Sequence, residues 1–596
     1  MYYHFEYVGL PRSYKWANTN NLAKVLKELM HSYLRGADRI WIVNVGDIKP
    51  MEIPFAFAMD LAWNVSNFSF ERIPTYLKLL AMRDFGADFA DEIADILLEH
   101  SHLIGMRRFE LVTSGTFSTL NYHEAERVLG RWKSLAERAK AVYEQLDKQT
   151  QPAFYQLVYH PVASGTIYYS VMVGVGTNYK YALERRNSAN TVARQVLDDF
   201  DASYDMVEEY DAMLGGKWAN MMSQAVYDAA WQEPKSWAGP ARDMLANLSF
   251  VQLRQDMQFS LGNLGIYAEG STSPIEQGRW AESVDSSMPT TGYTALLPQM
   301  DRFGPRVRYI DLFARGDYRV PIDWELEEIP VDFISISPAR GTLNRDKPDE
   351  RLNVTIDWSL VPDDFDDTVN IGITSTPSRY PYFDLIRIPV VNTQVPADFK
   401  GFPETAGMIS IEAPHFQRSS AITHKKKDEQ DPTVNFSVFP HLGSRSESGS
   451  IGLRPFAEAR QVDNAATSAW VEYDIYLFSD AEAVEATVYI NGCLDTDPRL
   501  RMQFSLTLGD APANFTRVLG DYITNPYAGD IPPEWLDHVA DQVWTKKVEL
   551  GGLEAGKHTL RWAANSPEVY LEKIVLNTRG GVKESYLGPP ETRLVE

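Results

Sequence analysis

The sequence predicts a multidomain α+β protein that begins with part of a (β/α) TIM-type barrel, continues as a helical bundle and ends in antiparallel, jelly-roll-like β-sandwiches. Three changes of pattern predict this order. Strands alternate with helices at first, apolar residues then recur three and four positions apart, and from about Leu261 they alternate with a period of two. We therefore expect a partial barrel over residues 1–75, a helical bundle over 76–260, a β-rich domain over 261–430 and a C-terminal β-sandwich over 431–596.

The partial barrel is predicted from two β/α units. The aromatic run MYYHFEYV predicts a first strand, and the spacing of apolar residues over 22–34 predicts a helix. The apolar run over 40–43 predicts a second strand that is buried on both faces, as in a parallel sheet. A complete barrel takes about 250 residues, so two units leave a sheet edge open. We expect the missing strands to lie upstream, and the chain to be N-terminally truncated.

The chain after residue 75 divides into a helical and a β-rich part. Segments such as ADFADEIADILLEHSHLIG and YHEAERVLGRWKSLAERAKAVYEQL combine helical apolar spacing with charged outer faces, which predicts a bundle. Later segments such as RLNVTIDWSL, AWVEYDIYLFS and KHTLRWAANS alternate or are rich in β-branched residues, with turn residues between them. This pattern is typical of antiparallel sandwiches of the jelly-roll type.

The composition excludes several classes of protein. The 596 residues carry 57 Lys and Arg against 81 Asp and Glu, a net charge of −24, so we expect no nucleic-acid partner and no docking on anionic membranes. No apolar run approaches the roughly 18 residues of a membrane span, and MYYHFEYVGL does not have the pattern of a signal peptide. The single cysteine excludes an internal disulfide and a Cys-rich metal site. We expect no cofactor and assign no metal ligand.

Polar side chains follow the second predicted strand, at the edge where parallel sheets bind ligands. Asn44, Asp47, Lys49 and Glu52 fall within nine residues. In a functional interpretation Asn44 donates hydrogen bonds, Asp47 acts as an acid, a base or an orienting group, and Lys49 contacts an anion. In the alternative interpretation Asp47 caps the following helix and Lys49 pairs with it.

The first predicted strand carries a second polar group. Tyr3, His4 and Glu6 lie along this strand, and strand alternation places His4 and Glu6 on one face. Arg12 follows beside aromatic residues, a combination that suits a sugar acid because the ring stacks and the guanidinium pairs with the carboxylate. An aromatic packing loop with a surface arginine is the alternative. The P-loop, GxGxxG, HExxH and GxSxG motifs do not occur.

The blocks YYHFEYVGLPRSYKW and GADRIWIVNVGDIKPMEIPFAFAMDLAWN resemble the middle of glycoside hydrolase family 115, the xylan α-1,2-glucuronidases. LNYHEAERVLGRWKSL, AFYQLVYHPV, GGKWANMMSQ and LGIYAEGS resemble the helical domain of the family and its exit. RYIDLFARG, SISPARG and GGVKESYLGPPET resemble its β-rich tail. The blocks are collinear and span nearly the whole chain, but family members carry an α/β domain and most of a TIM barrel before the first of them.

The resemblance implies a glycosidase that removes 4-O-methyl-glucuronic acid from glucuronoxylan or xylo-oligosaccharides with inversion. Inversion needs a general acid and a general base whose carboxyl groups lie roughly 6.5–9.5 Å apart. The matching positions make Asp47, Glu52 and Glu6 candidate catalytic residues, but part of the family's carboxylates precede the first block, so we expect little activity from this chain alone. The candidate substrate-binding residues are Tyr3, His4, Arg12, Asn44 and Lys49.

A second hypothesis from a different class is a noncatalytic carbohydrate-binding or assembly module built on the β-sandwich domains, including a homodimer. A row of exposed aromatic residues on one sandwich face would favour it, although core packing explains the same residues. The candidates for this row are Trp470, Tyr473, Tyr476 and Tyr489. Because the family acts on an extracellular polymer, we expect the full-length parent protein to be extracellular.

Overall fold

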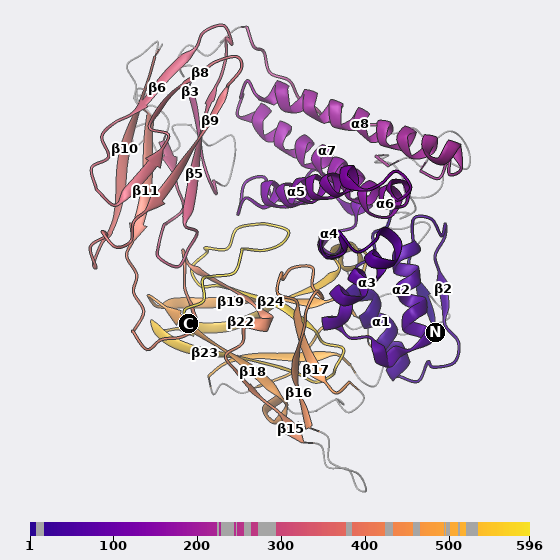
Figure 1. Ribbon diagram of the computed structural model, residues 1–596. Coiled ribbons are helices and arrows are strands. Elements are labelled where there is room, and N and C mark those ends of the chain that lie inside the picture. Colours follow the sequence, from indigo (N-terminus) through magenta and orange to yellow (C-terminus); the bar gives the residue numbers. More distant parts are fainter. Residues whose placement is uncertain are drawn as a thin grey trace.

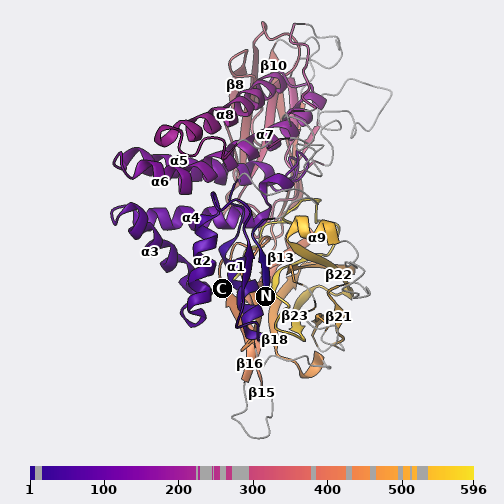
Figure 2. The ribbon, with the colours of Figure 1, turned by 90° about the vertical axis from the view of Figure 1, so that its right-hand side faces the viewer.

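The computed structural model describes residues 1–6, 17–222, 226–227, 244–245, 247–254, 264–271, 294–376, 384–423, 433–456, 465–493, 495, 501–509, 513–519 and 535–596. A helical region comes first along the chain, and two β-sandwiches follow it (Figure 1). The view turned by 90° shows the helical region packed along both sandwiches (Figure 2). None of the described helices is long and apolar enough to cross a membrane.

Two parallel strands open the structure. β1 (Tyr2–His4) pairs with β2 (Ile42–Asn44), and α1 (Leu22–Leu34) and α2 (Glu52–Trp63) follow them, so the predicted β/α alternation is confirmed. The Asn21 side chain caps α1 by accepting the backbone N–H of Lys24 at 2.8 Å. Among the described residues, β1 and β2 pair only with each other, and no barrel is formed. The expected burial of the second strand is wrong, because 49% of Ile42 is exposed.

The helical region is built around one hydrophobic core. All of its helices contribute to this core, which also contains Phe5 and reaches Phe439, Tyr570 and Leu587 of the C-terminal part. The expected boundary at residue 75 therefore does not separate two cores. The helices after α2 are α3 (Ile73–Phe85), α4 (Ala90–Met106), α5 (Glu124–Gln145), α6 (Gln151–Phe154), α7 (His160–Leu183) and α8 (Ala189–Gly216).

The first sandwich packs a four-stranded sheet, β3-β5-β9-β7, on a five-stranded sheet, β4-β11-β10-β6-β8. Buried residues of both sheets form one core, and all pairings except β4 with β11 are antiparallel. The strands are β3 (Leu264–Ala268), β4 (Thr294–Leu296), β5 (Val307–Ala314), β6 (Ile322–Leu326), β7 (Ile334–Ser337), β8 (Arg340–Leu343), β9 (Asp349–Ile356), β10 (Asp366–Thr376) and β11 (Asp384–Val391).

The second sandwich also consists of two sheets around one core. Its strands are β12 (Phe402–Pro403), β13 (Met408–Glu412), β14 (Arg418–Ser420), β15 (Ile422–Thr423), β16 (Thr433–Phe439), β17 (Ser450–Arg454), β18 (Trp470–Leu477), β19 (Ala481–Asn491), β20 (Gln503–Leu508), β21 (Thr516–Arg517), β22 (Val543–Leu553), β23 (Gly556–Ala564) and β24 (Leu571–Asn577), with helix α9 (Trp535–Asp541) before β22. Because β12 pairs with β18 and β13 pairs with β24, this sandwich begins at Phe402 and not at the expected residue 431.

A buried carboxylate joins the helical region to the second sandwich. Glu124, the first residue of α5, is 0% exposed and accepts the backbone N–H groups of Ser118, Tyr586 and Leu587 at 2.7, 3.0 and 2.6 Å. The Tyr586 hydroxyl also donates to the Met106 carbonyl at 3.0 Å. A buried carboxylate is costly unless donors surround it, and here three donors do so. The segment after β24, the C-terminal tail (residues 578–596), is thereby held on α5.

A layer of charged residues joins the same end of α5 to the first sandwich. His123 Nε2 lies 3.5 Å from Glu269, and His123 Nδ1 lies 3.6 Å from Glu126. Arg351 on β9 donates to both Glu126 oxygens, at 2.7 and 3.0 Å, and to Asp311 at 2.7 Å. Burial lowers the pKa of His123, but its hydrogen bonds to Glu126 and Glu269 outweigh that effect and raise the pKa to about 9.

Replacing Glu124 is expected to loosen the tail. In Glu124→Ala three backbone donors lose their acceptor, so the free energy of unfolding should fall by about 2–4 kcal/mol. Urea unfolding followed by circular dichroism measures this loss. Glu144→Ala, at an exposed position on the same helix, is the matched control and should change the free energy of unfolding by less than about 0.5 kcal/mol. Equal effects of the two substitutions would contradict the role of Glu124.

The His123 contacts predict a pH dependence of stability. The pKa of about 9 in the folded protein exceeds the ordinary value of 6.5, so the stabilisation is complete below pH 6.5 and is lost as the pH rises through 9. The thermal midpoint of the wild type should therefore fall more between about pH 6 and pH 10 than that of His123→Asn. His558→Asn serves as the control and should follow the wild type. Parallel pH profiles of wild type and His123→Asn would rule out this contribution.

Candidate active site

The two predicted polar groups meet at the carboxyl ends of the parallel strands. The register pairs Tyr3 with Val43 and His4 with Asn44, and the Asn44 amide nitrogen lies 3.1 Å from His4 Nδ1. Tyr3 faces the other way and packs against the helical core beside Phe5. The strand pairing therefore brings residues forty positions apart into one site, as parallel β/α units require.

Glu6 lies just beyond β1 and is buried. Gly46, in the loop after β2, covers it: its φ is +61°, and a Cβ at this position would lie 2.7 Å from Glu6 Oε2. Only glycine combines this backbone conformation with so close an approach. The loop after β2 therefore closes over the carboxylate of the first strand and holds it in place.

The loop after β2 and the start of α2 carry the remaining candidates. Lys49 pairs with Glu52 at 2.6 Å, and the α2 N-cap is Met51, which makes no side-chain cap. Because α2 has no side-chain cap and Lys49 pairs with Glu52, the alternative interpretation of Asp47 and Lys49 is wrong. Arg12 lies outside the described residues, so its expected contact with a sugar carboxylate stays a prediction.

The helical region contributes two residues that the sequence analysis did not assign to the site. The Lys49 ammonium lies 4.7 Å from the centre of the Trp218 ring. Tyr210 on α8 is buried, its hydroxyl has no hydrogen-bond partner among the described residues, and burial together with the Glu52 carboxylate raises its pKa. Trp218 lies in the GGKWANMMSQ block, just after Gly215 and Gly216 end α8 with φ of +68° and +84°. The glycine pair Gly215–Gly216 just before Trp218 was the sequence feature that could have pointed to this residue of the site.

The arrangement offers acid–base groups, an ammonium and an aromatic ring around one strand edge. Such a set can bind a charged sugar and move protons at a glycosidic oxygen or a water. The site is open on one side, because 58% of Tyr2 and 49% of Ile42 are exposed.

A polar cavity away from the strand ends lies between α1, α4 and the second sandwich. It has a volume of about 20 Å³, and its lining includes Lys24, Arg108 and Gln542. Burial and the neighbouring charges of Arg108 and Lys27 lower the pKa of Lys24 to about 7. The cavity holds about one water molecule, so it is too small for a sugar ring.

The predicted row of exposed aromatic residues on the second sandwich is not formed. Trp470 and Tyr476 lie on the outer side of β18, but Tyr473 points into the core and is fully buried. Tyr489 on β19 packs against Gly588 of the C-terminal tail. Core packing accounts for Tyr473 and tail packing for Tyr489, so the core-packing alternative holds for these two residues.

Two comparisons with protein families decide the identity of the chain. Residues 1–111, which contain the strand-end site, match glycosyl hydrolase family 115. Residues 401–591, which form the second sandwich and most of the tail, match the glycosyl hydrolase family 115 C-terminal domain. The chain belongs to glycosyl hydrolase family 115. A comparison with curated proteins found no significant match.

One solved structure is similar in fold to this family 115 chain over nearly its whole length. BtGH115A, described as a 4-O-methyl-α-glucuronidase with specificity for decorated arabinogalactans, matches with a TM-score of 0.52 and 16% identity over 96% of this chain and 50% of that one. The chain thus spans about half the length of that relative. A carbohydrate-binding module of Cellvibrio mixtus lichenase 5A aligns with 28% of this chain and 96% of its own, at 14% identity and a TM-score of 0.16, too low to support an argument.

Proposed function

We propose that this family 115 chain contributes to an α-glucuronidase that removes (4-O-methyl)-glucuronic acid from glucuronoxylan or xylo-oligosaccharides by an inverting mechanism. One observation carries the proposal: the ends of two parallel strands meet, with Asn44 3.1 Å from His4 and the Lys49–Glu52 pair in the adjoining loop. Family membership and the fold likeness to a 4-O-methyl-α-glucuronidase support it.

The proposed chemistry needs two carboxyl groups with different tasks. A general acid protonates the glycosidic oxygen, while a general base takes a proton from the water that attacks the anomeric carbon from the opposite face. Asp47 suits the base because it is exposed to water, whereas Glu52 pairs with Lys49 and Glu6 is buried under Gly46. We assign the acid to a carboxyl group on a further strand of the completed sheet.

Recognition of the sugar acid is proposed for the loop after β2. The Lys49 ammonium can contact the uronate carboxylate as a point charge. Trp218, 4.7 Å from that ammonium, offers a flat apolar surface for the sugar ring. Asn44 and His4 supply hydrogen bonds to its hydroxyl groups, and Arg12 is proposed as a second cation for the carboxylate.

The exposed residues of the β1–β2 sheet support the proposal that further strands join it. Parallel sheets are covered on both faces, yet the strands here expose Tyr2 and Ile42. We infer that additional β/α units, in the same polypeptide or in another chain, complete a barrel-like sheet and the active site. The chain alone then has little activity. Since the substrate is a polymer outside cells, we propose an extracellular location for the complete enzyme.

Assayed alone on glucuronoxylan, the 596-residue chain is expected to release uronic acid roughly 10²–10⁴-fold more slowly than a complete family enzyme, because the general acid is proposed to lie on a further strand. Anion-exchange chromatography of the released acid measures the rate, with a glucuronic-acid-decorated arabinogalactan as second substrate. Release at an ordinary rate would contradict the need for further strands. Release from the arabinogalactan only would contradict the proposed polymer.

Two substitutions in a protein that carries the further strands separate the proposed roles. Asp47→Asn should lower kcat about 10²–10⁴-fold with little change in KM, because it removes the base. Lys49→Ala should mainly raise KM, by about tenfold, because it removes a contact to the substrate carboxylate. Glu485→Gln on the second sandwich is the control and should match the wild type. A Lys49→Ala enzyme with an unchanged KM would disprove the carboxylate contact.

A further inference from the structure

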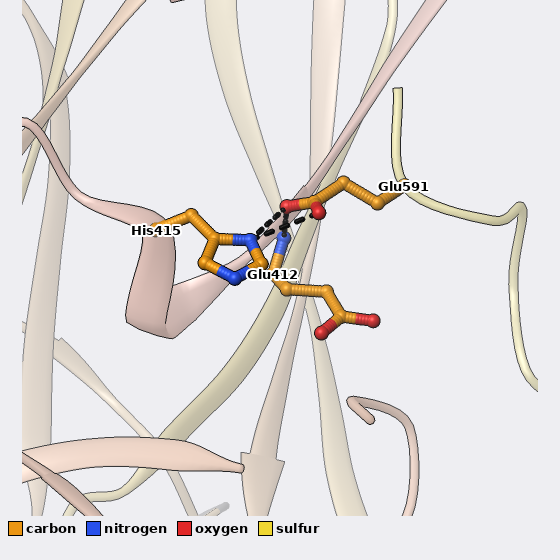
Figure 3. Close-up of side chains that lie close together, drawn as sticks. All are labelled: Glu412, His415 and Glu591. Atoms are coloured by element: carbon orange, nitrogen blue, oxygen red, sulfur yellow. Dashed lines mark hydrogen bonds and ion pairs between the residues drawn. The ribbon is translucent and has the colours of Figure 1, made fainter. Parts of the chain in front are cut away.

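A cluster that the proposed function does not use lies on the second sandwich. Glu412 ends β13, His415 ends the following 3-10 turn η7 (Ala413–His415), and Glu591 belongs to the C-terminal tail. Figure 3 shows the imidazole of His415 facing the carboxylate of Glu591, with Glu412 beside them. One potential ligand atom of each residue lies within 4.8 Å of the other two, and His415 Nδ1 lies 2.8 and 2.9 Å from the two oxygens of Glu591.

We propose that Glu412, His415 and Glu591 form a binding site for a divalent first-row transition metal ion of the zinc type. An imidazole nitrogen with carboxylate oxygens is a ligand set that zinc takes, and three protein ligands leave a coordination position for water. Calcium takes oxygen ligands, so an imidazole at the centre of the cluster favours the softer ion.

The surroundings orient these three side chains. His415 Nε2 lies 3.2 Å from the Ser448 hydroxyl, so the second ring nitrogen has its own partner while Nδ1 faces Glu591. The Glu412 carboxylate accepts the Ser446 hydroxyl at 3.1 Å and the Ser448 backbone N–H at 2.9 Å. Metal-binding histidines and carboxylates are usually held by such outer hydrogen bonds. These contacts hold the three side chains near one another, and an ion bound at about 2.0–2.2 Å to each draws their ligand atoms closer than the 4.8 Å within which they now lie.

Charge and access also suit a cation. With a neutral imidazole, the carboxylates of Glu412 and Glu591 together carry more negative charge than the nearby buried ammonium of Lys573 offsets. His415 and Glu591 are 37% and 21% exposed, which leaves a path from solvent, whereas Glu412 is buried. An entering ion takes the place of the Nδ1 proton that faces Glu591, and this proton is released to solvent.

The position of the cluster suggests what the ion does. Glu591 follows Tyr586 and Leu587 in the tail, and these two residues are held by Glu124 of α5. An ion shared by Glu591 and the β13–η7 segment ties the tail to the sandwich close to that contact. The site is therefore structural and independent of the glycosidase chemistry.

The test uses the full chain after removal of bound metal with a chelator. Isothermal titration calorimetry with Zn²⁺ should show one ion per chain with a dissociation constant in the micromolar range or below, and zinc should raise the thermal midpoint. His415→Gln and Glu591→Gln should each weaken binding by at least about tenfold, because each removes a ligand. His558→Gln, in the same sandwich, should keep the wild-type affinity.

Circular dichroism of each variant without metal shows whether it folds. If one variant does not fold, the other variant and the wild-type titration decide. Three results would overturn the proposal: no stoichiometric zinc binding by the wild type, unchanged affinity in folded His415→Gln, or displacement of zinc by an equal concentration of Ca²⁺.

Discussion

The buried carboxylate of Glu124 is the contact on which the arrangement of the three parts depends. It lies at the first turn of α5 and binds the backbone of the C-terminal tail, while its neighbours His123 and Glu126 bind Glu269 and Arg351 of the first sandwich. Both sandwiches are thus attached to one end of a single helix. Because the carboxylates of Glu124 and Glu269 are buried, each needs its partners, and these contacts hold the three parts together.

This position determines what surrounds the strand ends. α8 packs along α7, and the turn that follows α8 brings Trp218 to the Lys49 ammonium. The candidate active site is therefore a joint product of the β/α units and the helical region. The tail that Glu124 holds also carries Glu591, so the candidate metal cluster and the main joint of the molecule lie on one short segment of chain.

Local patterns predicted much of the fold, because periodicity within a segment is set by neighbouring residues alone. The helix over 22–34, the two N-terminal strands and the β-strands of the sandwiches are found where the spacing of apolar residues indicates them. The boundaries were less accurate. β12 and β13 join the second sandwich through pairings with β18 and β24, and no local pattern records a partner so far along the chain.

The sequence by itself determined the secondary structure, the family and the two groups of polar residues that follow β1 and β2. Only the tertiary structure decided that Lys49 pairs with Glu52, that Tyr473 is buried, that Ile42 is exposed, and that Trp218 and Tyr210 border the site. It also decided that His415 meets Glu591. Contacts of this kind depend on how sheets, helices and tail close on one another, and this closure is a property of the whole chain.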